Sequence, residues 1–377
     1  MPRRFARLEM KMLHSRISFI SDRRIGPVAF FCAIILAMNE HQRARYLRQM
    51  IFSNIGEAGQ EKLLGARVLV VGCGATGSVI ASTLARTGIG YLKIADRDFV
   101  ELNNLQRQVL YDQDDVHSRT PKAIAAANKL RRVNSSIQIV PCVVDVHAEN
   151  IEELIADVDL VLDGTDNFET RYLVNDACVK HNKAWIYGGA VSSYGATFTI
   201  RPHESACFRC IFLHAPPPGT LPTCDTVGVI APIVNVIGSL VSAEAIKFFV
   251  GSGERNRGLV NIDLWENSFD VLEIERRADC PCCVKHQFAF LDDAHDGAAF
   301  LCGRNAIQIR PPKKSALDLA QLAARLQPLG RVAQNDYLVQ FTLDDFDITI
   351  FPDARAIIKG TEDAGIARTV YAKYVGT

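Results

Sequence analysis

The strongest constraint on the fold is a glycine-rich turn between a buried strand and a helix. Residues 67–71 read Arg-Val-Leu-Val-Val, a continuous apolar run typical of a strand buried on both faces of a parallel sheet. Gly72-Cys-Gly-Ala-Thr-Gly77 follows, and a helical pattern continues through 78–87. Such a turn lets backbone amides approach a phosphate at the helix N-terminus. It therefore predicts a nucleotide-binding α/β fold, but many nicotinamide and flavin enzymes share it.

The alternation of strands and helices continues to residue 187. We expect further strands at 91–95, 137–143, 160–163 and 184–187, and helices at 121–132, 151–156 and 168–181. This order predicts a Rossmann-like, doubly wound, mostly parallel sheet. Strands expected at 197–201 and 259–264, with a helix at 232–250 between them, predict an antiparallel extension of the same domain, which we assign to residues 38–286.

Residues 287–377 have the pattern of a separate, smaller α+β domain. A strand is expected at 306–310, a hairpin at 337–343 and 346–351, and helices at 316–326 and 363–374. No motif in this part of the sequence assigns it a role.

The first 37 residues differ in composition from the rest of the chain. They carry seven basic and two acidic residues, and an apolar run fills 28–37. This resembles the basic region and apolar core of a secretory signal, and it is too short for a membrane span, which needs about 20 apolar residues. Alternatively, Met38 is the true start, because a helical pattern opens directly after it. We expect residues 1–37 to be a leader that is disordered or not translated.

Charge and hydropathy exclude several classes of partner. The 42 basic and 42 acidic residues give a net charge of zero, whereas a nucleic-acid-binding chain usually shows a basic excess. The apolar stretch at 231–250 contains Asn235, Glu244 and Lys247, which favours a buried helix. We therefore expect no nucleic-acid and no membrane partner, and a cytoplasmic location.

Charged residues after the predicted strands narrow the choice of nucleotide chemistry. Asp96 and Asp98 end the second strand, where an acid can bind a ribose hydroxyl. Arg107 follows, Lys122 opens a helix, and Asp166 comes just after the fourth strand. Sites in this architecture lie at the C-terminal ends of the strands, so these groups can converge on phosphates. A nucleotidyl transferase needs such cations and a carboxylate for magnesium, whereas a dehydrogenase needs little positive charge beyond its glycine loop.

Four of the 11 cysteines form two Cys-x-x-Cys pairs, Cys207 with Cys210 and Cys280 with Cys283. Four thiolates in such pairs suit tetrahedral zinc with Zn–S bonds of about 2.3 Å, and buried free thiols are the alternative. Cys282 lies inside the second pair, but the spacing favours Cys280 and Cys283. All four positions would be filled, which predicts a structural site.

From about Arg45 to Cys283 the sequence resembles the ThiF/MoeB/HesA family, the bacterial relatives of the ubiquitin-activating enzymes. The resemblance is carried, in order, by Arg45-Tyr-Leu-Arg-Gln49, the glycine loop, Asn104-Leu-Gln-Arg-Gln108, Thr165-Asp-Asn167, the two cysteine pairs and Thr223-Cys-Asp-Thr-Val-Gly228. Residues 163–168, 185–191 and 223–228 resemble the ThiF branch more than the MoeB branch.

The resemblance implies an ATP-dependent adenylyltransferase. Its substrate would be the C-terminal glycine of a ubiquitin-like sulfur carrier, ThiS-like and serving thiamin thiazole biosynthesis, with pyrophosphate as the second product. One alternative is a MoaD-like carrier for molybdopterin biosynthesis, and another is a non-catalytic nucleotide-binding scaffold. The resemblance also implies a homodimer, and a sulfur donor enzyme is a further candidate partner.

The resemblance also implies roles for single residues around ATP and Mg²⁺. Backbone amides would approach the nucleotide at the three loop glycines, Gly72, Gly74 and Gly77. Asp96 would hold the ribose, and Asp166 would place Mg²⁺ near the α-phosphate. The phosphates would meet Asn104, Arg107 and Lys122.

Two further residues would act beyond the nucleotide. Arg48 matches the arginine that this family inserts into the neighbouring subunit's site, although it could be a solvated helix charge. Cys224 follows Pro216-Pro-Pro-Gly219, on an expected exposed crossing loop, and matches the cysteine that can bond the activated carrier. Some relatives finish their task at the adenylate, so its covalent role stays open. Cys73, inside the glycine loop, is interpreted as a packing residue.

Overall fold

Two β-sheets organise the chain in this computed structural model. The structure describes residues 38–216, 223–292, 298–301, 305–311, 316–343 and 345–376. The predicted leader, residues 1–37, and residues 217–222 of the expected crossing loop lie outside the described residues. Residues 44–377 form a single unit that contains both sheets.

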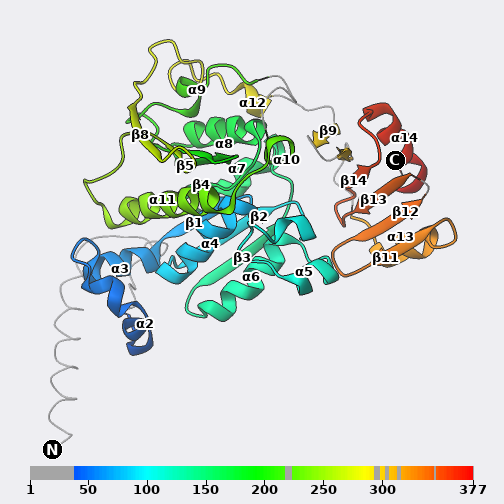
Figure 1. The fold of residues 1–377 in the computed structure, drawn as a ribbon, viewed down its shortest axis with the longest axis horizontal. Helices are drawn as coiled ribbons and strands as arrows, with labels where there is room; N and C mark the ends of the chain where they lie inside the picture. The colour runs from blue at the N-terminus through cyan, green and yellow to red at the C-terminus, as the bar shows by residue number, and fades with distance from the viewer. Residues whose placement is uncertain are drawn as a thin grey trace, which may run out of the picture. The chain divides into compact units, whose positions relative to one another are not determined.

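The first sheet has eight strands in the order β3-β2-β1-β4-β5-β6-β7-β8 (Figure 1). The parallel strands are β1 Arg67–Val71, β2 Tyr91–Asp96, β3 Gln138–Val143, β4 Leu160–Asp163 and β5 Ala184–Val191. The antiparallel extension consists of β6 Tyr194–Ile200, β7 Gly258–Asp263 and β8 Ser268–Glu273. The predicted doubly wound, mostly parallel sheet is therefore confirmed, with β8 as a strand that the sequence did not predict.

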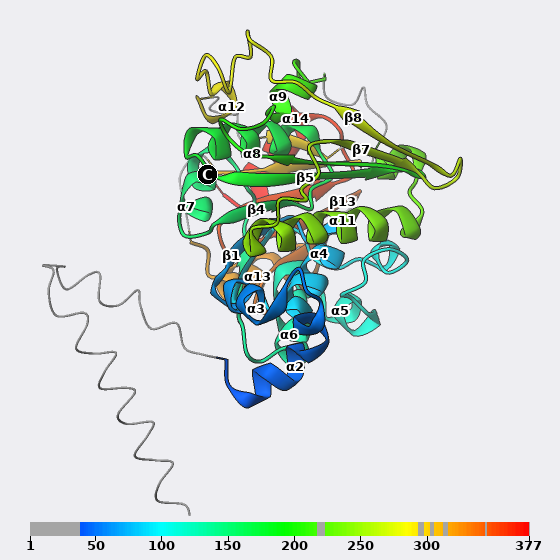
Figure 2. The same cartoon turned by 90° about the vertical axis from the view of Figure 1, so that its left-hand side faces the viewer.

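Helices cover both faces of this sheet, and alternate residues of β1 show why. Val68 and Val70 belong to one apolar core, while Leu69 and Val71 belong to the other. Side chains of a strand alternate between faces, so a continuous apolar run fills both cores. Figure 2 shows α8 on one side of the sheet and α11 on the other. The first core contains residues of α4 Ala75–Thr87, α6 Lys122–Val133 and α11 Ala231–Val250, and the second contains residues of α7 Ala148–Ala156 and α8 Phe168–Lys180.

Helix α11 is, in the part of the chain that the structure describes, the one helix long and apolar enough to cross a membrane. In the structure it packs on α4, β5 and α3 Gly56–Gly65. A Cβ at Gly238 would lie 2.7 Å from Val79 Cβ, so glycine lets α11 approach α4 closely. Glu244 is buried and pairs with Lys247 at 2.6 Å. These contacts agree with the predicted buried helix.

Short helices connect the main elements. They are α2 Glu40–Ile51, η2 Leu102–Asn104, α5 Gln113–Ser118, α9 Phe208–Ile211, α10 Cys224–Val227 and α12 Ala289–Asp292.

The second sheet is antiparallel and belongs to the described residues from 298 onward, here named the C-terminal module. Its order is β11-β12-β13-β14-β10-β9. The strands are β9 Ala298–Leu301, β10 Ala306–Ile309, β11 Arg331–Gln334, β12 Val339–Leu343, β13 Phe346–Ile350 and β14 Ala356–Lys359. Helices α13 Leu319–Leu326 and α14 Ala364–Tyr374 complete its apolar core. The domain boundary after residue 286 stays a prediction.

Candidate nucleotide site and metal centre

The glycine loop after β1 brings three chain segments together. Gly72 has φ +83°, and a Cβ there would lie 2.7 Å from Gly164 O in the turn after β4. A Cβ at Gly77 would lie 1.9 Å from Gly72 O, so only glycine lets α4 pack this close to the loop. At Gly74 the nearest atom to a Cβ would be Gln108 Nε2, 3.9 Å away. Gly74 thus leaves space beside the backbone at the start of α4, where a phosphate group could approach.

Asp96 ties the glycine loop to the segment that follows β2. Its Oδ2 accepts from the Cys73 amide at 2.6 Å, and its Oδ1 accepts from the Asp98 amide at 2.7 Å. Burial raises the pKa of Asp96. Each carboxylate oxygen has a second lone pair, so Asp96 can still accept from a ribose hydroxyl, as the sequence predicts.

Lys122 lies beside this acidic segment at the start of α6. Its side chain is 4% exposed, and its Nζ is 3.3 Å from Asp98 Oδ2. Its backbone amide donates to Asp98 O at 2.9 Å. Asp98 thus contacts a buried ammonium group and belongs to the same charged group as Asp96.

The segment after η2 carries the other two predicted phosphate contacts. Asn104 is buried, and its Oδ1 accepts from the Glu101 amide at 3.1 Å. Arg107 is half-buried, and its Nη1 donates to Asn103 O at 2.7 Å. Asn104 is therefore a fixed part of the loop, whereas Arg107 has its guanidinium near the surface.

Asp166 is exposed in the turn after β4, and its carboxylate lies in the field of two arginines. Burial lowers the pKa of Arg97, but Asp145, Asp98 and Asp166 raise it by more, so its pKa lies above the usual value. Arg171 also has a raised pKa, to which Asp166 contributes.

Sequence reasoning missed both arginines. The charged triplet Asp96-Arg97-Asp98 at the end of a buried strand is the signal that could have found Arg97. Arg171 follows Glu169 and Thr170 in a helix of mixed polarity and has no such signal.

Two predicted residues lie apart from this charged group. Arg48 is on α2 and is exposed in the single chain, so the structure does not join it to Asp96 and Lys122. Cys224 begins α10, is half-buried, and has its Sγ 3.5 Å from Ala190 O. A cavity of about 460 Å³ adjoins α10 and is lined by Ser192, Ser193, Val227, Gly228, Val229, Ile230 and Trp265.

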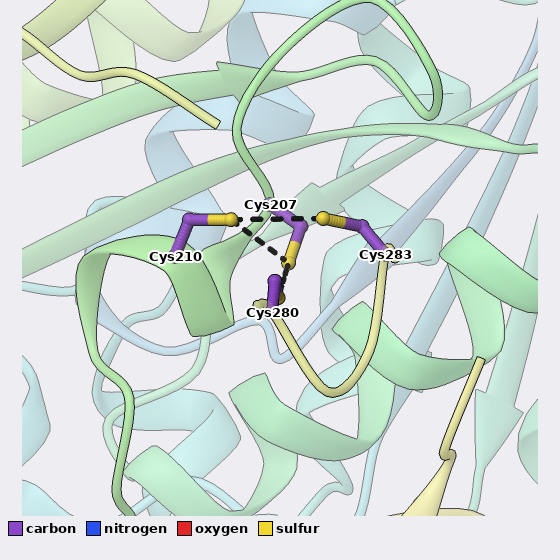
Figure 3. Close-up of side chains that lie close together, drawn as sticks. All are labelled: Cys207, Cys210, Cys280 and Cys283. Carbon is purple, nitrogen blue, oxygen red and sulfur yellow. Dashed lines mark hydrogen bonds between the residues drawn. The ribbon is translucent and has the colours of Figure 1, made fainter. Parts of the chain in front are cut away.

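The four cysteines of the two Cys-x-x-Cys pairs meet in the second core (Figure 3). Cys207 Sγ lies 3.9 Å from Cys210 Sγ and 3.6 Å from Cys280 Sγ, and Cys210 Sγ lies 3.6 Å from Cys283 Sγ. All four ligand atoms lie within 4.8 Å of one another. Zn–S bonds of about 2.3 Å in a tetrahedron require sulfur–sulfur separations of about 3.8 Å. The cluster therefore fits zinc in size and in donor chemistry.

Cys282 contacts Cys207 of the cluster and has two further partners outside it. Asn175 Nδ2 donates to its Sγ at 3.2 Å, and the Cys282 thiol is hydrogen-bonded to the buried Asp176. Asn175 Oδ1 in turn accepts from the Phe208 amide at 2.9 Å, next to Cys207. Cys282 thus has polar partners of its own, beside the four-cysteine cluster.

A glycine turn open to phosphate, a buried acid and lysine at the strand ends, and a four-cysteine centre together define a nucleotide-binding α/β protein with a structural metal site. The sequence matches the ThiF family over residues 46–282. The chain belongs to the ThiF family.

Two curated relatives illustrate the match. The chain is 44% identical over 336 residues to the sulfur carrier protein ThiS adenylyltransferase of Bacillus subtilis, covering 88% of this chain and 99% of that protein. It is 40% identical over 245 residues to the sulfur carrier protein adenylyltransferase of Thermus thermophilus, covering 63% and 90%. These names confirm the predicted class of enzyme. Because 88% of 377 residues exceeds 282, the Bacillus match extends into the chain beyond the ThiF region.

Solved structures of MccB from Escherichia coli share the fold. The complex of MccB with ATP has a TM-score of 0.57 and 25% identity, and the match covers 63% of this chain and 74% of that chain. The complex with AMPCPP and MccA has a TM-score of 0.57 and 26% identity, with the same coverage. This fold therefore holds ATP in one related protein.

Proposed function

We propose that this chain uses ATP to adenylate the C-terminal glycine of a ubiquitin-like sulfur carrier protein, ThiS-like, and releases pyrophosphate. The observation that carries the proposal is the 44% identity with a ThiS adenylyltransferase over 88% of this chain and 99% of that protein. The group formed by Gly74, Asp96 and Lys122 supports it, because a nucleotide can meet backbone amides, a carboxylate and a cation there.

The chemistry requires positioning more than proton transfer. A carboxylate oxygen of the carrier forms a bond to the α-phosphorus, and the bond between that phosphorus and the bridging oxygen breaks, so pyrophosphate leaves with the electron pair. The nucleophile is already ionised at neutral pH and needs no general base. Repulsion between the carboxylate and the triphosphate is the obstacle, and positioned cations lower it. Lys122 and Arg107 would supply these cations.

Asp166 would hold Mg²⁺, since a hard cation prefers carboxylate oxygen, and the ion would offset triphosphate charge. Asp166 is exposed, whereas the neighbouring Asp163 is buried and its carboxylate is occupied by Thr165 and Arg171. Of these two acids, Asp166 is therefore the one that a metal ion can reach.

Zinc in the four-cysteine centre would have a structural role. Cys207 and Cys210 lie at α9, while Cys280 and Cys283 follow β8, so one ion would join two segments 73 residues apart. All four sulfurs are buried in the second core. With four protein ligands, no coordination position is left for a substrate.

A homodimer is supported by the surface of α2 and the turn after it. Leu47, Ile51 and Phe52 are 51%, 65% and 57% exposed, next to the exposed Arg48. Apolar side chains gathered in this way are typical of an interface. In the dimer we propose, a second copy covers them, and Arg48 enters the partner's nucleotide site.

Complementation tests this dimer. The variants Arg48→Ala and Asp166→Asn are each expected to be inactive. When the two chains are coexpressed, half of the dimers are mixed and each mixed dimer has one intact site, so about a quarter of the wild-type activity should return. Activity that stays absent in the mixture would show that Arg48 acts within its own chain.

The carrier has a candidate docking surface near Cys224. Strand β8 is the last strand of its sheet and is exposed at every residue, with Phe269 and Val271 60% and 50% exposed. Trp265, in the turn before it, is 75% exposed and lines the cavity beside α10. We place the body of the carrier on this apolar surface and its C-terminal tail along the cavity.

Pyrophosphate–ATP exchange with the purified chain tests the function. We expect exchange with a ThiS-like carrier that ends in Gly-Gly, and none with the same carrier lacking its last glycine. Because exchange reports only adenylation, Cys224→Ala should retain it. Exchange with a MoaD-like carrier alone would reassign the substrate. Failure with both carriers while ATP still binds would require another acceptor, and loss of ATP binding would favour a scaffold.

A further inference from the structure

The segment between β2 and η2 has two different sides. It is extended: Phe99 forms a bridge with Pro121, and the Val100 amide donates to Thr120 O at 3.1 Å. Side chains of extended backbone alternate in direction. Asp96 and Asp98 contact the glycine loop and Lys122. Arg97, Phe99 and Glu101 therefore point the other way.

The C-terminal module contacts all three of these outward residues. Arg355 Nη2 donates to Arg97 O at 2.9 Å, and Lys359 Nζ donates to Glu101 Oε1 at 2.7 Å. Phe99 packs against an apolar cluster of the module, formed by Ala306, Leu338, Phe351 and Ile357. Every second residue of the segment thus meets the module.

A buried charged network strengthens the first of these contacts. Asp145, just after β3, accepts from Arg97 Nη1 at 3.0 Å and from Gln308 Nε2 at 2.6 Å, and it pairs with Arg310. Arg355 is 1% exposed, and its Nη1 donates to Gln308 Oε1 at 3.1 Å. Burial alone would raise the pKa of Asp145, but the three arginines hold it at about 2. The Asp145 carboxylate is therefore ionised at neutral pH, and it joins Arg97 to Gln308 and Arg310 of the C-terminal module.

The module also reaches the other end of the phosphate-facing stretch. Asn335 Nδ2 donates to Ser118 O at 2.9 Å and to Arg119 O at 3.3 Å. These carbonyls lie three and four residues before Lys122. The stretch from Asp96 to Lys122 is thus held by the module near both of its ends.

We propose that the C-terminal module is a positioning element of the nucleotide site, and that Arg355 is its central positioning residue. Arg355 binds the backbone carbonyl of Arg97. Arg97 lies between Asp96, which contacts Cys73, and Asp98, which contacts Lys122. Without Arg355, the extended segment can shift and the site must be ordered when ATP binds, which weakens binding. The inference rests on the proposed function only in that ATP is the ligand.

Nucleotide binding by the full chain tests the inference without any carrier. The probe is AMPCPP, titrated by calorimetry into wild type and into Arg355→Met, Arg355→Lys and Lys359→Met. The matched control is Arg325→Met, because Arg325 Nη2 also binds two carbonyls, of Tyr374 and Val375 at 2.9 Å, but within the module. Thermal unfolding of each variant measures its structural damage separately.

We expect Arg355→Met to raise the Kd for AMPCPP about tenfold, the size of one lost charge-assisted hydrogen bond. Arg355→Lys, which keeps the charge beside Asp145, should recover part of this loss. Lys359→Met removes a half-buried surface pair and should fold normally with a smaller increase. Arg325→Met should lower thermal stability and leave Kd within twofold.

Equal Kd values for wild type, Arg355→Met and Lys359→Met would overturn the inference. So would a Kd that follows thermal stability across all variants, the control included, because the effect would then be purely structural. If wild type itself fails to bind AMPCPP, the proposed function fails rather than the positioning role.

Discussion

Arg171 Nε donates to Asp163 Oδ2 at 2.9 Å, and both side chains are almost completely buried. Arg171 Nη2 also donates to Thr165 O at 2.6 Å, and Asp163 Oδ1 accepts from the Thr165 amide at 2.8 Å. The pair therefore fixes both sides of the turn that leads to Asp166. This turn contacts the glycine loop at Gly164, so an ion pair in the interior shapes the phosphate-facing surface.

Arg171→Met should destabilise the protein by about 3–5 kcal/mol, because it leaves the Asp163 carboxylate buried without its cation. The measurement is urea unfolding with zinc present. Lys180→Met is the control: Lys180 pairs with Glu152 at 2.8 Å, both groups are about 40% exposed, and the change should cost at most about 1 kcal/mol. Similar losses of stability in the two variants would show that the buried Arg171–Asp163 pair contributes no more than an exposed ion pair.

The first sheet could be predicted because β1, β2, β4 and most of β5 are buried on both faces and read as apolar runs. β1 and β4 begin and end where the sequence predicts. β8 was missed because all of its residues are exposed. It forms by backbone pairing with β7, so it has no run of buried apolar residues that would mark a strand in the sequence. β14, Ala356–Lys359, was also missed.

The predicted site residues divide in a similar way. Glycines, cysteine pairs and charged residues at strand ends carry local signals, and the structure brings most of them together. Arg355 carries none, because 258 residues separate it from Arg97 and only the fold makes the two neighbours. Arg48 and Cys224 belong to roles that need a second chain or a carrier, and a single chain cannot display those.

Two glycines of the loop should respond differently to alanine. Gly77→Ala places a Cβ 1.9 Å from Gly72 O, so α4 must move away from the loop, and we expect a large loss of thermal stability. Gly74→Ala meets nothing within 3.9 Å, so it should fold and instead hinder the approach of a phosphate. Calorimetry with AMPCPP should show at least tenfold weaker binding for Gly74→Ala. Unchanged binding would place the phosphates elsewhere.

Cys73 should be chemically inert although it lies in the nucleotide loop. It is fully buried, and burial raises the pKa of its thiol to about 12, so almost no thiolate exists at pH 8. Iodoacetamide at pH 8 followed by peptide mass spectrometry should modify the half-buried Cys224 well before Cys73. Cys73 should react at an ordinary rate once urea unfolds the chain. Rapid labelling of Cys73 in the folded protein would contradict its packing role.

Metal content should distinguish the four clustered cysteines from Cys282. We expect about one zinc per chain in the wild type and less than a tenth of that in Cys280→Ser, which lacks one of four ligands. Cys282→Ala should keep its zinc, because the four clustered thiols fill a tetrahedral site without Cys282. Elemental analysis of purified protein measures both. If Cys282→Ala lost its zinc and Cys280→Ser retained it, Cys282 would be a zinc ligand and Cys280 would not.

Asp145 should make stability depend on pH in a predictable direction. Its folded pKa of about 2 lies below the unfolded value of about 3.9, so its contribution is present above pH 4 and is lost as pH falls toward 2. Integrated over this window, the loss is about 2 kcal/mol. We therefore expect Asp145→Asn to be less stable than wild type at pH 5, and the difference between them to shrink by about 2 kcal/mol between pH 5 and pH 2.5 in urea titrations. A difference that stays constant over this range would mean that Asp145 does not hold the C-terminal module through its charge.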